Sequence, residues 1–313
     1  MLAPEFIALL EQRKSAQLPI IGVATADELR ALTPARIALA GPVPSGVVIT
    51  QCSMPTRDGA LIDAHVLRPA AATNEPSPWL MYYHGGGWVH NTIDIYDASL
   101  AQLVLDTGMT VVSVNYRKAP EHGFPTPLDD CWDALQWCIT HANDLRVDPL
   151  RTTVAGDSSG GNLAAAVALL ARDVAPLLAQ VLIYPCLDPS LTTASSYTYA
   201  TGYGLERSAM EWYWQQYVQD HSLLTNPLVA PAHADDVSKL PRTLIITAEN
   251  DLLRDEAHDY HGRLSASGVD TSYICYDGTI HGFFTYGSIS DIPRRAICDI
   301  AAWISTSNSP SMS

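Results

Sequence analysis

The sequence predicts an α/β fold in which a mostly parallel, twisted sheet is flanked by helices. Three observations lead to this prediction. From residue 46 onward, short β-rich runs alternate with helical stretches, as in consecutive βαβ units. The chain has 313 residues, 47% of them hydrophobic, which is enough to bury a large core. One segment, residues 187–240, interrupts the alternation and is expected to be an insertion at the ends of the strands.

The predicted elements follow one another in a regular order. Strands are expected at 46–50, 61–67, 79–83, 110–116, 152–156 and 179–185, with helices near 95–106, 128–141 and 160–172. After the insertion, strands are expected at 242–248 and 272–276, with helices near 254–266 and 293–305. We therefore divide the chain into an N-terminal cap segment (1–45), a first part of the core (46–186), an inserted cap segment (187–240) and a last part of the core (241–313).

The two cap segments are expected to contact each other above the strand ends. The N-terminal segment begins with a predicted amphipathic helix whose apolar residues need a partner; they are Phe6, Ile7, Leu9 and Leu10. The inserted segment offers an aromatic partner in "MEWYWQQYV", which contains Trp212, Tyr213 and Trp214. Together these segments would form a roof over the pocket.

The charge of the chain disfavours several classes of partner. A formal net charge of -15 repels polyanions, so nucleic acid and anionic membrane surfaces are poor candidate partners and a small-molecule ligand is expected. The N-terminus lacks the basic region and cleavage site of a secretory signal. No apolar run approaches the roughly 20 residues that a membrane span requires. A cytoplasmic protein without a membrane span is therefore expected.

The cysteines give no indication of a metal site. All six are scattered without a CxxC pair or nearby histidine ligands, which argues against zinc. In a reducing compartment they are expected to be buried free thiols. The sequence implies neither a metal nor an organic cofactor.

A nucleophile motif follows the strand predicted at 152–156. Gly156-Asp157-Ser158-Ser159-Gly160 matches G-x-S-x-G, and an alanine-rich helix begins directly after it. This context predicts a sharp turn that exposes the Ser158 hydroxyl, with glycines where side chains would collide. The alternative is a phosphate-binding glycine turn, which is disfavoured because no lysine follows it.

A serine nucleophile needs a histidine base and an acid, which follow it in the chain order Ser, Asp or Glu, His. His281 lies in a glycine-flanked turn after the last predicted strand and is the expected base. Two aspartates follow strands in the permitted interval, Asp188 and Asp251. Asp251 is preferred because its strand is close in topology to the turn of His281. The alternative role for Asp251 is an N-cap of the following helix.

Three consecutive glycines in "HGGGW" suggest a backbone site for the oxyanion of acyl transfer. Bare backbone N–H groups can meet the developing charge if no side chain blocks them. Gly85 and Gly86, with the residue after the nucleophile, Ser159, are the expected donors. Trp88 beside this loop and Trp212 in the insertion are the expected substrate-binding residues.

These motifs together resemble the bacterial hormone-sensitive-lipase-like carboxylesterases of the α/β-hydrolase fold. The matching pieces are "YYHGGGWV", "VVSVNYRKAPEHGFPTPLDDCWDALQW", "VAGDSSGGNLAA", "NPLVAP", "LPRTLIITAENDLLRDEAHDYHGRL" and "HGFF", in the family's order. The resemblance implies Ser158, Asp251 and His281 as the triad, a helical cap, and pairing of two copies through the last strand. The chain departs from the family at Ser159, where alanine is usual; its hydroxyl could compete for His281 or order a water.

The expected function is that of a serine carboxylesterase acting on esters of short- to medium-chain acids through an acyl-enzyme. Each methylene that fits an enclosed apolar slot adds up to roughly 0.8 kcal/mol, until the chain meets the wall. One alternative within enzymes is a deacetylase or amidase acting on aryl substrates, which needs the same parts. The alternative from another class is a small-molecule receptor on this fold, and the presence of His281 argues against it.

Overall fold

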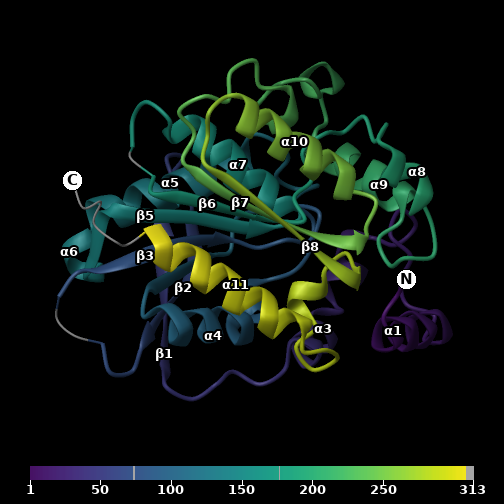
Figure 1. Cartoon of the computed structure of the whole chain (residues 1–313), viewed down its shortest axis with the longest axis horizontal. Coiled ribbons are helices and arrows are strands. Elements are labelled where there is room, and N and C mark those ends of the chain that lie inside the picture. Colours follow the sequence, from purple (N-terminus) through teal and green to yellow (C-terminus); the bar gives the residue numbers. More distant parts are fainter. Residues whose placement is uncertain (73–74, 176, 308–313) are drawn as a thin grey trace.

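The sheet lies in the middle of the molecule, between two layers of helices (Figure 1). The structure is a computed structural model, and it describes residues 1–72, 75–175 and 177–307. Eight strands form one sheet in the order β1-β2-β4-β3-β5-β6-β7-β8. Their bounds are β1 Val47–Pro55, β2 Leu61–Pro69, β3 Ser77–Tyr83, β4 Thr110–Val114, β5 Val147–Asp157, β6 Ala179–Ile183, β7 Arg242–Asn250 and β8 Thr271–Ile280.

Strand direction divides the sheet into a short antiparallel edge and a long parallel part. β1 pairs with β2, and β2 with β4, in antiparallel register, whereas β4, β3, β5, β6, β7 and β8 all run parallel. Parallel neighbours need crossover connections, and helices supply them. The carboxyl ends of the parallel strands therefore meet at one edge of the sheet, where loops can bring distant residues together.

Helices cover both faces of the sheet. The helices are α1 Pro4–Ser15, α2 Ala26–Arg30, α3 Thr33–Ala40, α4 Asp97–Thr107, α5 Thr126–Thr140, α6 Ala142–Leu145, α7 Ser159–Ala171, α8 Ala194–Thr198, α9 Arg207–Tyr217, α10 Arg254–Ala266 and α11 Ile292–Ser307. In Figure 1, α4 and α11 lie on one face, and α5, α7 and α10 on the other. The helices α8 and α9 of the inserted segment lie beyond the sheet, at one end of the molecule.

The predicted α/β architecture is confirmed, and each predicted strand and helix has a counterpart. The helix predicted near 254–266 coincides with α10. β5 and β8 are longer than predicted, beginning at Val147 and ending at Ile280. The added residues include polar ones and a proline, which give no clear strand pattern in the sequence, although neighbouring strands pair with the ends of both extensions.

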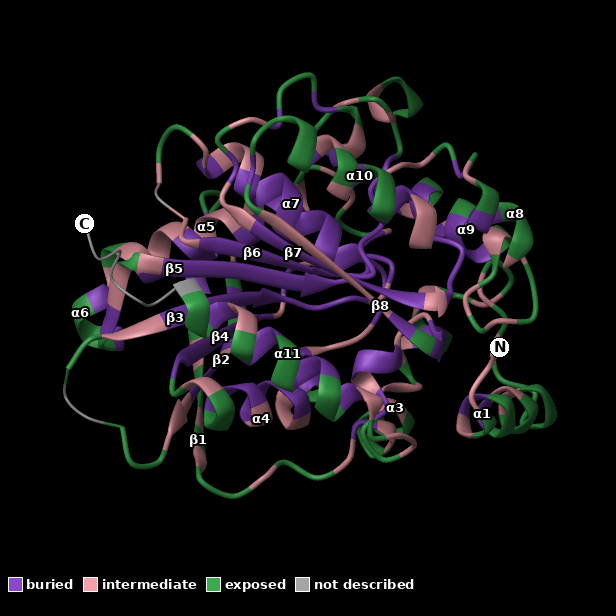
Figure 2. Ribbon diagram, viewed as in Figure 1, coloured by how far each residue is buried: buried purple, intermediate pink, exposed green. Residues whose placement is uncertain are grey.

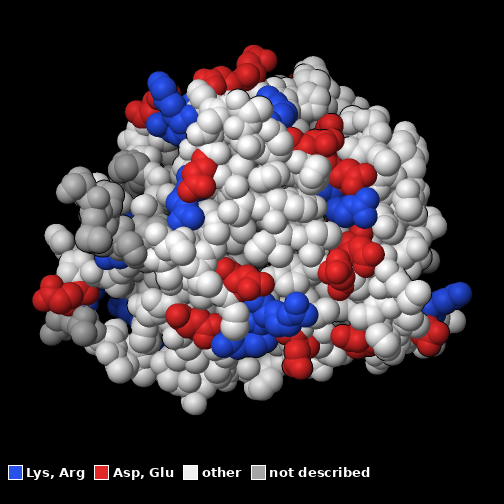
Figure 3. Space-filling model, in the orientation of Figure 1, with Lys and Arg blue, Asp and Glu red and all other residues white. Residues whose placement is uncertain are grey.

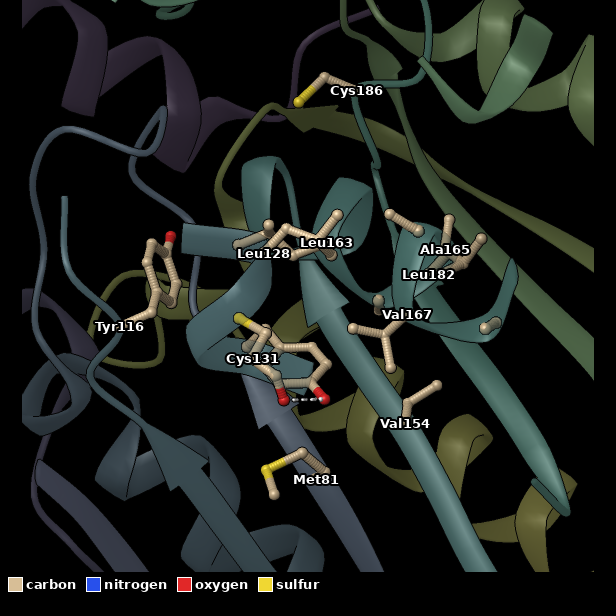
Figure 4. Close-up of a cluster of buried hydrophobic side chains, with 14 of the residues drawn as sticks. Met81, Tyr116, Leu128, Cys131, Val154, Leu163, Ala165, Val167, Leu182 and Cys186 are labelled. Carbon is tan, nitrogen blue, oxygen red and sulfur yellow. Dashed lines mark hydrogen bonds between the residues drawn. The ribbon is translucent and has the colours of Figure 1, made fainter. Parts of the chain in front are cut away.

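The core consists of one cluster on each face of the sheet. The central strands are buried over nearly their whole length (Figure 2), as expected when helices cover both faces. On one face, Met81 and Val154 of the sheet pack with Leu163 and Val167 of α7 (Figure 4). On the other face, α4 and α11 cover the sheet, with Leu100 and Ile300 in the same cluster. This packing fixes the ends of β3, β5, β7 and β8.

The N-terminal helix does not pack where the sequence analysis expected. Phe6 of α1 is fully buried against the end of β8 and the following loop, with its ring 6.4 Å from that of Tyr286. Arg13 Nη2 donates to the Tyr286 hydroxyl at 2.9 Å. It is residues 20–23, after α1, that line a groove with Trp212 of α9. Residues 20–23 therefore meet the inserted segment at Trp212, whereas Phe6 of α1 packs against the sheet.

Charged side chains of both signs lie on the surface (Figure 3), and the six cysteines differ in how far they are buried. On the face in Figure 3, basic side chains lie beside acidic ones. No described helix is long and apolar enough to cross a membrane. All six cysteines are free, but only Cys131, Cys138 and Cys186 are buried and Cys298 is exposed, so burial of all six was a wrong prediction.

Replacing Phe6 by alanine should lower the free energy of unfolding by about 3–5 kcal/mol, because the change leaves a cavity between α1 and Tyr286. Ile7, on the same helix but 43% exposed, provides the matched control, and Ile7→Ala should cost less than about 1 kcal/mol. Urea unfolding of the three proteins measures both values. Equal losses for the two variants would contradict this packing of α1.

Candidate active site

Ser158 occupies the turn between β5 and α7 at the carboxyl edge of the sheet. Its backbone has φ 55° and ψ -121°, a strained conformation for a residue with a side chain. A Cβ atom on Gly156 would collide with the carbonyl of Gly160, and one on Gly160 would collide with the carbonyl of Tyr83. The glycines of the motif are therefore required by the close approach of the turn to β3.

Ser158, His281 and Asp251 form one continuous row of hydrogen bonds. The Ser158 hydroxyl lies 2.8 Å from His281 Nε2, and His281 Nδ1 lies 2.7 Å from Asp251 Oδ2. Asp251 is 1% exposed, and its second oxygen accepts from the N–H of Leu253 at 3.0 Å. The carboxylate thus faces the imidazole and accepts a backbone N–H in the turn before α10. The alternative N-cap role was wrong, because the N-cap position of α10 is Leu253 and no side chain caps this helix.

The alternative acid, Asp188, lies in a different pair. Its Oδ1 is 3.1 Å from Nε2 of His233, and both residues belong to the inserted segment. Of the two aspartates that follow strands, only Asp251 therefore reaches His281 in this structure.

The first of the three glycines is not available to an oxyanion. Gly85 N–H donates to Asp157 Oδ1 at 2.8 Å and lies 3.1 Å from the Tyr96 hydroxyl. The expectation that Gly85 supplies an oxyanion donor was therefore wrong, because a buried carboxylate already accepts its only N–H. The sequence offered no sign of this contact, since Asp157 is 72 residues away.

The second and third glycines present the open backbone instead. Within the described residues, the N–H groups of Gly86, Gly87 and Ser159 have no hydrogen-bond acceptor. Gly86 and Gly87 have φ of 121° and 60°, values that favour glycine. A Cβ atom on Gly87 would collide with the ring of Tyr213 in α9. Gly87 was missed by the sequence analysis, although the third glycine of the run was the available signal.

Asp157 joins the nucleophile turn to the glycine loop. Besides Gly85 N–H, its carboxylate accepts from the hydroxyls of Tyr82 at 3.0 Å and Tyr96 at 3.1 Å. Burial raises the pKa of Asp157 to about 6, although these hydrogen bonds favour the ionised form. Asp157 directly follows Gly156 in the G-x-S-x-G motif and ends β5, and its structural role was also missed by the sequence analysis.

The histidine of the HGGG loop and the second serine of the motif both face the interior. His84 Nδ1 lies 2.7 Å from the Gly85 carbonyl, and its ring stacks on Tyr116 at 4.4 Å. Burial lowers the pKa of His84 to about 3, so this imidazole is neutral and braces the loop. The Ser159 side chain is fully buried beside Tyr116. It therefore does not compete for His281, and only its N–H faces the site.

The two tryptophans expected to bind substrate differ in how far they are exposed. Trp88 has no exposed surface; its ring stacks on Tyr217 at 4.3 Å and lies 4.5 Å from Trp214, both in α9. The expectation that Trp88 binds substrate was wrong, since its side chain is fully buried against α9 and offers no surface to a ligand. Trp212 is half-buried in the groove formed with residues 20–23.

One group of side chains could hold a metal ion among the described residues, and it includes none of Ser158, His281 and Asp251. It comprises His65, Asp94 and Asp97, in which His65 Nδ1 and Asp97 Oδ1 are 2.9 Å apart. The donor set around Ser158 is that of proton transfer and nucleophilic attack: a hydroxyl, an imidazole, a carboxylate and backbone N–H groups.

The comparisons with known proteins agree with this geometry. Residues 80–285 match the family described as alpha/beta hydrolase fold. The chain belongs to the α/β-hydrolase family. Among curated relatives, an ethyl acetate hydrolase of Pseudomonas putida is 33% identical over 91% of each chain, and carboxylesterase NlhH of Mycobacterium tuberculosis is 39% identical over 70% of each chain.

Solved structures of α/β-hydrolases resemble this chain over nearly its whole length. A thermostable esterase from Pseudomonas putida has a TM-score of 0.93 at 30% identity and covers 99% of this chain and 98% of its own. A serine-to-alanine mutant of an α/β-hydrolase from the metagenome of Lake Arreo has a TM-score of 0.91 at 33% identity and covers 98% of both chains. The predicted resemblance to hormone-sensitive-lipase-like carboxylesterases is confirmed.

The raised pKa of Asp157 makes a testable contribution to stability. Below about pH 4 the carboxyl is protonated in both the folded and unfolded states, but between pH 4 and 6 only the folded protein retains the proton. Relative to Asp157→Asn, the parent protein should therefore lose up to about 3 kcal/mol of unfolding free energy as pH rises through this window. Urea unfolding of both proteins at pH 4, 5, 6 and 7 measures the difference; a difference that does not change with pH would contradict the assignment.

Proposed function

We propose that this protein is a serine carboxylesterase that hydrolyses esters of short- to medium-chain acids, with Ser158 as nucleophile, His281 as base and Asp251 as the orienting acid. The observation that supports these roles is the row of hydrogen bonds from Asp251 Oδ2 through His281 to the Ser158 hydroxyl. The enzyme class itself is shown by the comparisons, since relatives at 33–39% identity are carboxylic ester hydrolases.

Acylation begins at Ser158. Its Oγ attacks the ester carbonyl carbon while the hydroxyl proton passes to His281 Nε2, and the carbonyl oxygen becomes an oxyanion. The N–H groups of Gly86, Gly87 and Ser159 donate to that oxyanion. Asp251 accepts from His281 Nδ1 and stabilises the imidazolium. Collapse of the intermediate breaks the ester bond, and the departing alcohol takes the proton from Nε2.

Deacylation repeats the same steps with water. His281 Nε2 removes a proton from a water molecule, whose oxygen attacks the acyl carbon, and the same three N–H groups stabilise the second oxyanion. The intermediate collapses, Ser158 recovers its proton from His281, and the acid is released. These steps require no metal ion or organic cofactor.

Residues 1–45 and 187–240 are proposed to form the cap over this site. The buried stack of Trp88 on Tyr217 supports a cap in which α9 is held rigidly against the glycine loop. A cap that does not move limits the length of acyl chain that fits beneath it. Location in the cytoplasm and pairing into a homodimer stay predictions.

The deacetylase or amidase alternative uses the same residues and differs in the leaving group, so only an assay with paired ester and anilide substrates separates it. The receptor alternative is disfavoured because His281 is present and lies within hydrogen-bond distance of Ser158.

Asp251→Asn should lower kcat by about four orders of magnitude, because the amide no longer holds His281 in the tautomer that accepts the serine proton. Ser158→Ala and His281→Ala should each be at least as damaging, since triad members act as a unit. Asp188→Asn is the matched control. Asp188 pairs with His233 and not with His281, so this variant should retain nearly full activity. Kinetics with p-nitrophenyl butyrate test this, and a reversed order of the two aspartate variants would refute Asp251 as the acid.

Acyl-chain preference should peak between about two and eight carbons. Each buried methylene contributes up to roughly 0.8 kcal/mol while it fits, and the gain disappears when the chain reaches the wall. A series of p-nitrophenyl esters from acetate to palmitate gives the profile in kcat/KM. Palmitate hydrolysed as fast as butyrate would show an open trough for long acyl chains.

A further inference from the structure

Three side chains from separate parts of the chain form a row beside the glycine loop, and the mechanism above does not use them. Arg36 comes from α3, His90 from the loop after Gly87, and Tyr213 from α9. Arg36 Nη1 lies 3.0 Å from His90 Nδ1, and His90 Nε2 lies 2.6 Å from the Tyr213 hydroxyl. The row thus connects both cap segments to the loop that carries Gly86 and Gly87.

His90 Nδ1 faces a donor, Arg36 Nη1, and an acceptor, the Asn91 side-chain oxygen at 2.9 Å. In either tautomer Nε2 and the Tyr213 hydroxyl share one hydrogen bond, which the ring donates when Nδ1 accepts from Arg36 and the hydroxyl donates when Nδ1 donates to Asn91. Burial and the nearby Arg36 charge lower the pKa of His90 well below its usual value, so the ring is neutral. The same Arg36 nitrogen lies 3.0 Å from both the Asn91 side-chain oxygen and the Leu29 carbonyl, so its two N–H groups are shared among three neighbours.

Arg36 is an unusual anchor because its partners are neutral. Within the described residues, no carboxylate lies within ion-pair distance of its guanidinium. Burial lowers its pKa, as expected when a cation leaves water without a counter-ion. Burial of a cation that only neutral acceptors satisfy carries a desolvation cost, which fits a side chain that is held for its position rather than for an ion pair.

Two members of the row, Tyr213 and His90, reach the backbone of the loop that carries Gly86 and Gly87. The ring of Tyr213 lies directly against Gly87, where a Cβ atom would collide with it. The backbone N–H of His90 donates to the Gly86 carbonyl at 3.0 Å, as does that of Val89 at 3.1 Å. His90 therefore holds Gly86 through its main chain, and holds Gly87 indirectly through the side chain that fixes Tyr213.

We propose that Arg36, His90 and Tyr213 are positioning residues that hold the Gly86 and Gly87 N–H groups where the oxyanion forms, and that through them both cap segments act on the rate of the chemical step. This inference rests on the proposed function. Donors must be in place before charge develops, so a small displacement of the loop weakens transition-state binding more than substrate binding.

The test compares two tyrosine-to-phenylalanine variants on the same helix. Tyr213→Phe keeps the ring on Gly87 and removes only the hydroxyl that meets His90. Tyr217→Phe is the matched control: the Tyr217 hydroxyl is buried, has no hydrogen-bond partner among the described residues, and belongs to a ring that stacks on Trp88. Both changes remove one buried hydroxyl from α9, so they differ only in the contact with His90.

Tyr213→Phe should lower kcat for p-nitrophenyl butyrate about tenfold with KM within about twofold of the parent, whereas Tyr217→Phe should change neither. Inhibition by a butyl trifluoromethyl ketone, whose adduct with Ser158 carries an oxyanion, should weaken by the same factor as kcat. Arg36→Met should produce a similar loss. Because both residues act through His90, the double variant should lose little more than either single one.

Three results would overturn the inference: equal kcat for the two phenylalanine variants, a Tyr213→Phe loss that falls on KM alone, or losses at Arg36 and Tyr213 that multiply. Thermal unfolding of each variant shows that the fold is kept. The parent protein separates this inference from the proposed function. If the parent hydrolyses no ester, the proposed function fails, whereas an active parent with an equally active Tyr213→Phe refutes only the positioning role.

Discussion

The hydrogen bond between the Asp157 carboxylate and the Gly85 N–H joins the two loops on which the rest of the site depends. One loop carries Ser158 at the end of β5, and the other carries Gly86 and Gly87 at the end of β3. The strands are neighbours in the sheet, so their ends lie close, but a shared edge does not by itself align a hydroxyl with two amides. Asp157 supplies that alignment, because it belongs to the first loop and its buried carboxylate accepts from the Gly85 N–H of the second. The hydroxyls of Tyr82 and Tyr96 satisfy the remaining hydrogen-bonding capacity of this carboxylate.

Two carboxylates near the nucleophile thus have different tasks that follow from their surroundings. Asp251 accepts from His281 and from the Leu253 backbone at the turn before α10. Asp157 is shielded by aromatic rings and neutral donors, and its pKa is raised to about 6. The first stabilises a charge that appears during the reaction, whereas the second maintains geometry throughout. Exchange of the two roles would require a different set of neighbours for each, because a carboxylate is only as acidic as its environment allows.

The inserted segment contributes to the site mainly through rings packed against glycine backbone. Tyr213 lies against Gly87, and Trp88 is enclosed by Trp214 and Tyr217. Close packing of rigid side chains leaves the loop little freedom, which suits a site whose donors must not reorganise during the reaction. Residue 87 must be glycine for this packing, because a side chain there would occupy the space that the Tyr213 ring fills.

The sequence by itself determined the succession of strands and helices along the chain, the identity of Ser158 as the residue at the sharp turn, and the selection of His281. These features are local, since periodicity, glycine at a tight turn and chain order can be read without knowing what lies across the molecule. Only the tertiary structure decided that Gly85 is already bonded, that Gly87 is open, that Trp88 is buried and that α1 packs against β8. Each of these depends on a partner distant in sequence, and a backbone N–H or an aromatic ring carries no local mark of the group that will meet it.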